Sequence, residues 1–197
     1  MTSRVVSSLL AFSLGMVMWG CVTAKPADFM ALQFQPSQVD RLVVLPVLDH
    51  RVDRQGVMDL DARILPIAER ELARLGYGYV VVRDRQSIEG IAREDLESPS
   101  SEWIGTLGPP GTRWVMTLVL EASSSSLTFG STGLAEMTGY LFDKQTHTLL
   151  WKNKELSQVG QGGLFGMMMK GMMEGLAIET AAELMFRTLP DRHQSKP

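Results

Sequence analysis

Asp49, His50 and Asp53 bring two carboxylates and one imidazole together within five residues. An imidazole changes charge near neutral pH, so this group has the residue types for acid–base catalysis or for holding a metal ion. The group follows an apolar run that ends at Leu45, and open α/β sheets bind ligands just past the ends of such strands. No distant residue completes a catalytic set. We therefore interpret the group as a solvated loop, with a small-ligand site in the loops after Leu45 and Val82 as the alternative.

The single cysteine, Cys21, stands in a context that predicts the attachment of lipid. Arg4 supplies a short positive region, and residues 5–19 form an apolar stretch that ends just before the cysteine. That order is the layout of a secretory signal peptide. A cysteine directly after the cleavage point resembles the lipobox of bacterial lipoproteins, although Met18 and Trp19 stand where that family usually has Leu and a small residue.

The lipobox resemblance implies that residues 1–20 are a lipoprotein signal peptide. It also implies a diacylglycerol on the Cys21 sulfur and an acyl chain on the new amino terminus, with no other cofactor. Such a lipid, palmitate among its acyl chains, anchors a chain to a membrane without spanning it. Val22 follows the cysteine and no Asp stands there, which in enteric-type sorting resembles an outer-membrane destination. The alternative is that Cys21 is an ordinary buried residue or part of an uncleaved anchor.

The net charge and the numbers of cysteines and histidines exclude several classes of function. The formal net charge is −3, so no basic field exists to hold nucleic acid, and we expect no such partner. One cysteine allows neither an internal disulfide nor a zinc or iron–sulfur site built on thiolates. The three histidines, His50, His147 and His193, are far apart and match no metal-ligand spacing, so we expect no metal site.

The apolar pattern of the first half predicts a parallel strand–helix–strand unit. Continuous apolar runs over residues 42–45 and 79–82 are typical of strands buried on both faces. Between them, residues 60–75 repeat apolar positions every three or four residues, which predicts an amphipathic helix closed by Gly76. A second helix is expected to begin after Asp84. These short connections favour a parallel arrangement.

The second half predicts antiparallel strands and a last helix. Residues 114–121 are expected to form a strand, and residues 123–126, a run of serines, to lead into a turn. Residues 134–142 and 149–156 then predict two strands joined as a hairpin. Residues 160–189 are rich in Gly and Met at first and regular in Ala, Leu and Ile later, and the last helix is expected there after residues 160–163. The expected fold class is α/β (α+β mixed): a single, three-layer-like domain with a mixed sheet, an N-terminal βαβ unit and a C-terminal antiparallel hairpin plus helix.

The ends of the chain are expected to lie outside this domain. Residues 21–40 mix Pro, Ala, Gln and scattered apolar side chains without a period, which favours a lipidated tether. Phe29, Leu32 and Phe34 in this segment could still dock on the domain surface. We therefore place the folded domain at residues 41–190, followed by a flexible tail at 191–197.

A cluster of methionines opens the last helix and is the candidate surface for a protein partner. Its members are Met167, Met168, Met169, Met172 and Met173. Methionine is flexible and polarizable and is common on contact surfaces, and the neighbouring Gly171 and Gly175 allow close approach of helices. Three consecutive methionines cannot all face one side of a helix, so at least one is expected to be exposed or to meet a partner. The alternative is the first turn of a core helix.

The order of these elements resembles several lipoprotein domains. The run at residues 41–46, the helix ending at residues 75–77 and the strand at 79–82 are similar to the start of the curli-secretion lipoprotein, the penicillin-binding-protein activator lipoprotein and the amino-terminal domain of TolB. Residues 111–115 and Leu141-Phe142-Asp143 with Leu150-Trp151 resemble the continuation of that group. The greatest likeness is to a lipoprotein family of Gram-negative bacteria thought to include auxiliary components of ABC-type transport systems.

The resemblance implies a periplasm-facing, membrane-tethered interaction domain and no enzyme, since these families are not enzymes and no catalytic residue carries over. We expect an accessory or assembly factor of a cell-envelope complex, in transport or envelope biogenesis. Its partners would be the membrane, through the lipid, and one or more envelope proteins. A homo-oligomer is a further expectation, because the curli-secretion relative forms a ring pore. A small-ligand-binding envelope lipoprotein is the alternative, and an envelope hydrolase a remote one.

Overall fold

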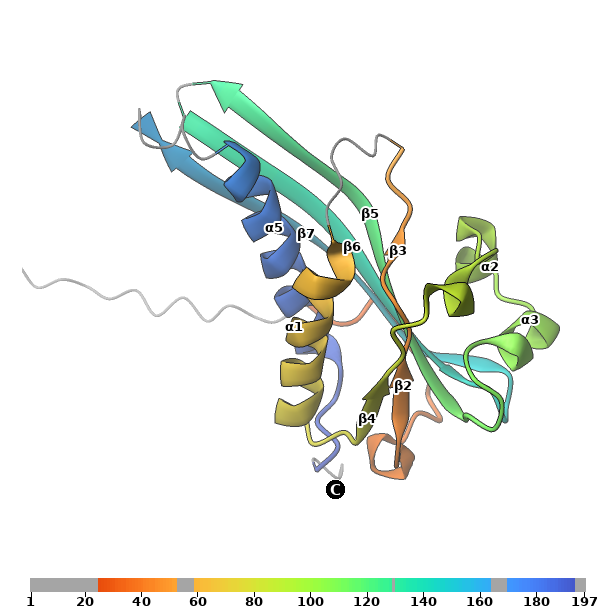
Figure 1. The fold of residues 1–197 in the computed structure, drawn as a ribbon. Helices are drawn as coiled ribbons and strands as arrows, with labels where there is room; N and C mark the ends of the chain where they lie inside the picture. The colour runs from red at the N-terminus through yellow and green to blue at the C-terminus, as the bar shows by residue number, and fades with distance from the viewer. Residues whose placement is uncertain (1–24, 53–58, 129, 164–169, 194–197) are drawn as a thin grey trace, which may run out of the picture.

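The computed structural model describes residues 25–52, 59–128, 130–163 and 170–193, which form one mixed sheet with helices packed on it (Figure 1). Within these ranges the sheet has seven strands in the order β1-β7-β6-β5-β2-β4, and β3 also pairs with β5. The strands are β1 (Phe29–Met30), β2 (Leu42–Val44), β3 (Leu48–Asp49), β4 (Tyr79–Val81), β5 (Trp114–Thr128), β6 (Gly130–Asp143) and β7 (Thr148–Gly162). The helices are α1 (Leu60–Arg74), α2 (Arg93–Glu97), α3 (Ser101–Thr106) and α5 (Lys170–Met185). The predicted fold class is confirmed.

The first half forms the predicted parallel unit. Strand β2 pairs in parallel with both β4 and β5. Between β2 and β4 the chain forms the short β3 and then α1. Asp59 caps α1 by accepting a hydrogen bond from the backbone N–H of Ala62 at 3.0 Å. The helix ends before Gly76, whose φ of +78° is a conformation that glycine adopts without strain.

The long strands extend further than the sequence predicts. The serine run at residues 123–126 belongs to β5, so its assignment to the start of a turn was wrong. Each of these serines pairs with a residue of β6, with a register shift between Leu120 and Ala122. The backbone ladder, and not side-chain propensity, holds this segment extended, because small polar residues give no local strand signal.

One predicted helix is also shorter than expected, for a local reason. The helix expected after Asp84 is a 3₁₀ turn, Arg85–Ile88, and α2 follows separately. Gly90 lies between them with φ of +82°, a left-handed backbone conformation that ends a right-handed helix. Residues 160–162, which the sequence places before the last helix, are the end of β7, and Gly162 pairs with Gly130.

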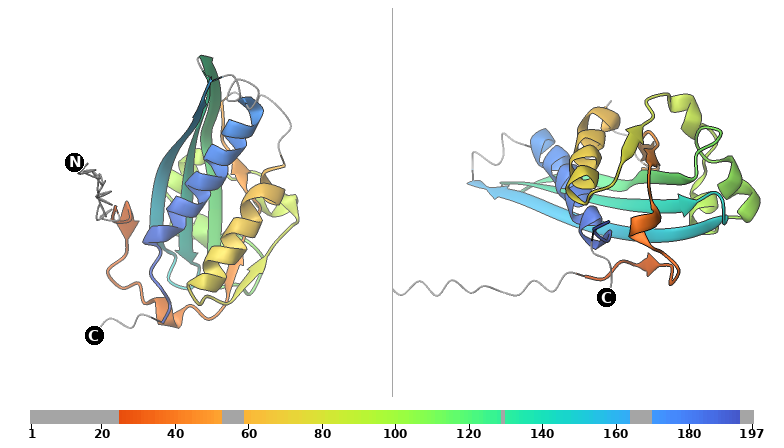
Figure 2. Two further views of the ribbon diagram at one scale, coloured as in Figure 1. Left: turned by 90° about the vertical axis from the view of Figure 1, so that its left-hand side faces the viewer. Right: turned by 90° about the horizontal axis from the view of Figure 1, so that it is seen from below.

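Two apolar cores lie on opposite faces of the sheet. One contains the inward face of α1 and α5 together with Met116, Trp151 and Phe186. The other lies beneath α2 and α3 and contains Phe142, where the ring of Trp103 meets that of Phe142 edge to face at 5.7 Å. Figure 1 and Figure 2 show α1 and α5 side by side on one face. Among the described residues, no helix has the length and apolarity needed to cross a membrane.

The segment expected to be a tether is bound to the domain from its first described residue. β1 pairs antiparallel with β7, and the backbone N–H of Ala31 donates to the Leu150 carbonyl at 2.8 Å. Ala31 and Val39 are buried, and Phe34 packs against the core. Phe34 thus takes the docked position that the sequence allowed for it, whereas Leu32 is fully exposed.

Helix α5 approaches the sheet closely over glycines of β6. A methyl group built on Gly133 would collide with the backbone carbonyl of Met173 in α5, and one on Gly139 would lie 2.8 Å from the sulfur of Met185. No real side chain tolerates such contacts without movement of its neighbours. These two positions therefore set the distance between the helix and the sheet.

We predict that Gly133→Ala destabilises the domain by about 1–3 kcal/mol, because the helix backbone has to move. Gly162→Ala is the matched control in the same ladder, since no described atom lies within 4 Å of its added methyl group. The control should be neutral or slightly stabilising. Urea unfolding of both variants measures the difference, and equal stability of the two would contradict the close packing described here.

Candidate functional site

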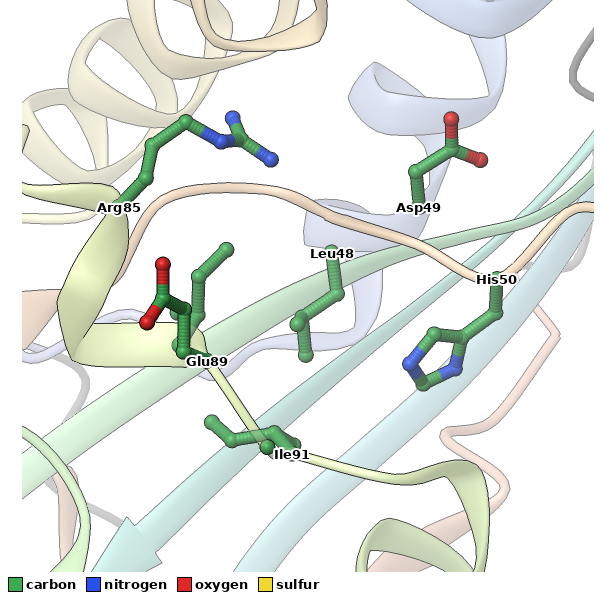
Figure 3. Close-up of a pocket in the computed structure, with 8 residues that line it drawn as sticks. Leu48, Asp49, His50, Arg85, Glu89 and Ile91 are labelled. Carbon is green, nitrogen blue, oxygen red and sulfur yellow. The ribbon is translucent and has the colours of Figure 1, made fainter.

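A cavity of about 370 Å³ lies where β3 meets the turn that follows β4 (Figure 3). It is lined by Leu48, Asp49, His50, Arg85, Ile88, Glu89, Gly90 and Ile91. The structure thus brings together the two loops that the sequence proposes for a small ligand, and it places Asp49 and His50 at their meeting point. Asp53, the third member of the predicted group, lies outside the described residues.

Asp49 and His50 point to opposite sides of β3 (Figure 3), as successive strand residues do. The carboxylate of Asp49 accepts two hydrogen bonds from Arg51, from Nε and Nη2, both at 2.9 Å. Asp49 is therefore committed to the guanidinium, and it does not face the imidazole next to it. These two side chains therefore do not form an acid–base pair.

His50 lines the cavity. Its Nδ1 is buried and has no hydrogen-bond partner within the described part of the chain. Nearby, Arg93 Nη2 donates to the His50 carbonyl at 3.3 Å and pairs with the Glu121 carboxylate at 2.8 Å. A buried unpaired polar atom is costly, but this nitrogen has no accessible surface, so a ligand in the cavity would reach it only after the imidazole ring turned.

The charges around this cavity are already paired in part. Arg85 at its rim contacts Asp61 at 2.5 Å, which ties the cavity wall to α1. Glu89 lines the cavity on the same side as Arg85, across from Asp49 and His50 (Figure 3). Within the described residues, no group of three or more His, Cys, Asp or Glu side chains is arranged to hold a metal ion.

A buried charged network lies beside the cavity, on the α5 side of the sheet. The Arg51 side chain is only 4% exposed. Besides Asp49, it donates from Nη1 to Ser123 Oγ at 3.1 Å and lies 3.7 Å from the Glu174 carboxylate. Ser123 Oγ in turn donates to Glu174 at 2.5 Å. The network joins β3, β5 and α5, and the serine run supplies one of its members.

The methionine cluster divides between surface and core. Met172 is exposed, whereas Met173 is buried against the sheet beside Gly133. Met167, Met168 and Met169 lie outside the described residues. Leu176, one turn after Met172, is also exposed, so the two form a small apolar pair on the outward face of α5. Leu176 was not predicted as part of this surface, although its four-residue spacing from Met172 is visible in the sequence.

A second surface is the extension of β5, β6 and β7 beyond the parallel strands (Figure 1). From the sequence, a sheet edge was the alternative to the methionine segment for docking a partner, without residues assigned to it. Helix α5 packs on one face of this extension, and α2 and α3 lie at the other end of the sheet. On the face away from α5, Leu134 and Leu156 are exposed, by 37% and 64%. We call this face, with the outer edge of β7, the open sheet surface.

The chain was compared with known families, curated proteins and solved structures, and only solved structures are similar to it. No protein-family model matches the chain, and no curated protein matches it. Among solved structures, lipoprotein GNA1162 from Neisseria meningitidis is 18% identical, covering 70% of this chain and 98% of that chain, with a TM-score of 0.46. The PelC dodecamer from Paraburkholderia phytofirmans is 12% identical, covering 80% and 93%, with a TM-score of 0.45. The LpoB C-terminal domain from Salmonella enterica is 17% identical, covering 60% and 82%, with a TM-score of 0.34.

We predict that Arg51→Met destabilises the domain by about 2–3 kcal/mol, because it leaves the carboxylates of Asp49 and Glu174 largely buried without their cation. Arg83→Met is the matched control, since Arg83 is 73% exposed and lies 3.6 Å from Glu69. An exposed pair contributes about 0–1 kcal/mol. Urea titration of both variants at neutral pH checks this, and a loss no larger for Arg51→Met than for Arg83→Met would contradict it.

Proposed function

We propose that this chain is a non-catalytic lipoprotein of the bacterial cell envelope, anchored by lipid on Cys21 to the outer membrane and facing the periplasm. In this proposal it is an accessory or assembly factor of an envelope complex, for transport or envelope biogenesis. The open sheet surface is the observation that carries the proposed role in binding a protein partner. The anchor is supported by the sequence around Cys21 alone.

The outer edge of β7 supports docking by strand addition. β1 covers this edge only at Trp151 and Lys152. The side chains of Lys25 and Asp28 then bond the backbone O and N of Lys154 at 3.0 and 2.7 Å. Backbone groups alternate in direction along a strand, so those of alternate residues from 156 to 162 also point outward.

An unpaired strand edge accepts an extended segment of another chain, and apolar side chains beside it add affinity. Leu134 and Leu156 lie diagonally across β6 and β7, since Leu134 pairs with Gln158 and Leu156 with Glu136. Together with this part of the edge, which has no strand partner among the described residues, they offer both backbone bonding and apolar contact. The exposed pair on α5, Met172 and Leu176, is the alternative contact surface.

We predict that Leu134→Asp combined with Leu156→Asp lowers capture of an envelope partner about tenfold or more, because docking would bury unpaired charge. A photo-crosslinking residue at Gln158, which is exposed, reports capture in intact cells. Leu127→Asp is the matched control: Leu127 is 46% exposed and stands on the other face of the same extension. The variants should retain the wild-type melting temperature.

Other outcomes of this crosslinking experiment identify other surfaces. If Met172→Asp abolishes capture and the Leu134→Asp, Leu156→Asp variant retains it, the interface is the exposed pair on α5 and not the open sheet surface. A crosslinked product of twice the chain mass would identify the partner as a second copy. His50→Ala should leave capture unchanged, because the residues that line the cavity do not include Leu134, Leu156 or the edge of β7.

We predict that an alkyne analogue of palmitate labels the wild-type protein in cells and that Cys21→Ala abolishes the label, since the lipid is attached at that residue. Val22→Asp is the control that keeps the cysteine: it should retain the label and move the protein to the inner membrane. Gel fluorescence and membrane fractionation measure the two effects. Absence of label on the wild type, or equal label on Cys21→Ala, would contradict the anchor.

Binding of a small polar ligand is a second candidate function. A cavity of about 370 Å³ that His50 lines favours it. The volume suits a small molecule, and the nearby Arg85 and Glu89 offer charge of both signs. This function and the partner-binding function use different surfaces, so they do not exclude each other.

A further inference from the structure

We infer that the domain lies directly against the membrane that holds its lipid, with residues 29–32 as the contacting surface. This inference rests on the proposed lipid at Cys21. It adds an orientation of the domain to the anchor, because a lipid on a long, loose tether would leave the domain free to turn. Three observations carry it: a short lead from the anchor, a rigid attachment of the segment, and exposed apolar side chains on that segment.

The segment of chain that leads from the anchor to the domain, which we call the lead, is short. Lys25 Nζ donates to the Lys154 carbonyl at 3.0 Å and pairs with Asp28 at 3.0 Å, so the chain is attached to β7 from Lys25 onward. Cys21 stands four residues earlier. Four residues span at most about 14 Å even when fully extended. A lipid inserted at Cys21 therefore holds the β1 and β7 edge within that distance of the bilayer surface.

The segment nearest the anchor is both fixed and apolar at its surface. Ala31 is buried and bonded to Leu150, so the residues on either side of it cannot turn inward freely. Phe29 and Met30 are 42% and 40% exposed, and Leu32 is fully exposed. Three large apolar side chains are thus exposed within four residues along this edge of the sheet, and exposed apolar surface of this kind marks an interaction site.

The membrane interface is the occupant that the short lead favours. Aromatic and long apolar side chains insert at the boundary between headgroups and acyl chains, where each adds to the binding energy of the lipid. A hollow of about 510 Å³ adjoins the patch, between residues 29–33 and the segment around Ile104 and Leu149. Lys25 and Lys154 beside it are already paired with carboxylates, so apolar contact and not charge supplies the attraction.

The test uses the full-length lipidated chain in vesicles of about three parts phosphatidylethanolamine to one part phosphatidylglycerol. In this form the Cys21 sulfur is blocked by its lipid, so a cysteine introduced by Leu32→Cys is the single reactive thiol. It is labelled with a fluorophore that spin-labelled lipids quench. Val52→Cys is the matched control, because Val52 is 102% exposed and Leu32 104%. Val52 follows β3, several strands across the sheet from β1.

We predict quenching about fivefold stronger at residue 32 than at residue 52, and a fall toward the control level when Phe29→Ser and Met30→Ser are added. Equal quenching at the two positions in a protein that floats with the vesicles would overturn the orientation and leave the anchor intact. Weak quenching at 32 together with crosslinking to a second copy through that residue would also overturn it. A second reactive thiol and failure to float would instead reveal the absence of the anchor, and both proposals would then fall.

Discussion

The close packing of α5 on β6 is the constraint on which the rest of the structure depends. Glycine at 133 and 139 removes the side chains that would hold the helix away, and Ala177 and Ala181 present equally small surfaces from the helix. Dispersion and apolar burial fall off steeply with distance, so a helix that approaches this closely covers one face of the long strands well. The opposite face receives no such helix along the extension, and its leucines stay exposed.

The buried ion network ties the loops of the parallel half to this helix. Arg51 reaches from the end of β3 to Ser123 and Glu174, so the position of α5 and that of the cavity loop depend on the same side chain. Charges this far from water hold their geometry only when they are mutually satisfied. The network therefore favours one relative arrangement of β3, β5 and α5, and it keeps Asp49 away from the imidazole of His50.

The spacing of apolar residues in the sequence predicted those strands and helices that carry such a pattern within their own residues. The runs at residues 42–45 and 79–82 and the helix at 60–75 carry their own periodicity, so they agree with β2, β4 and α1. The serine run has no such signal, since its strand conformation comes from pairing with β6. The opposed directions of Asp49 and His50 follow from β3, a strand of two residues that no periodicity detects. The exposure of Leu134 and Leu156 depends on which face α5 covers, which a strand's own alternation does not reveal.

The two proposed contacts lie at different places along the same strand. β1 pairs with β7 at Trp151 and Lys152, whereas the edge with no strand partner among the described residues continues to Gly162, ten residues beyond Lys152. At about 3.3 Å per residue, this separates the two sites by up to about 33 Å. A domain held to the bilayer through residues 29–32 could therefore keep the far end of β7 clear of the headgroups. The length of the β5–β7 extension, which the packing of α5 permits, then gives one edge strand room for both a membrane and a protein partner.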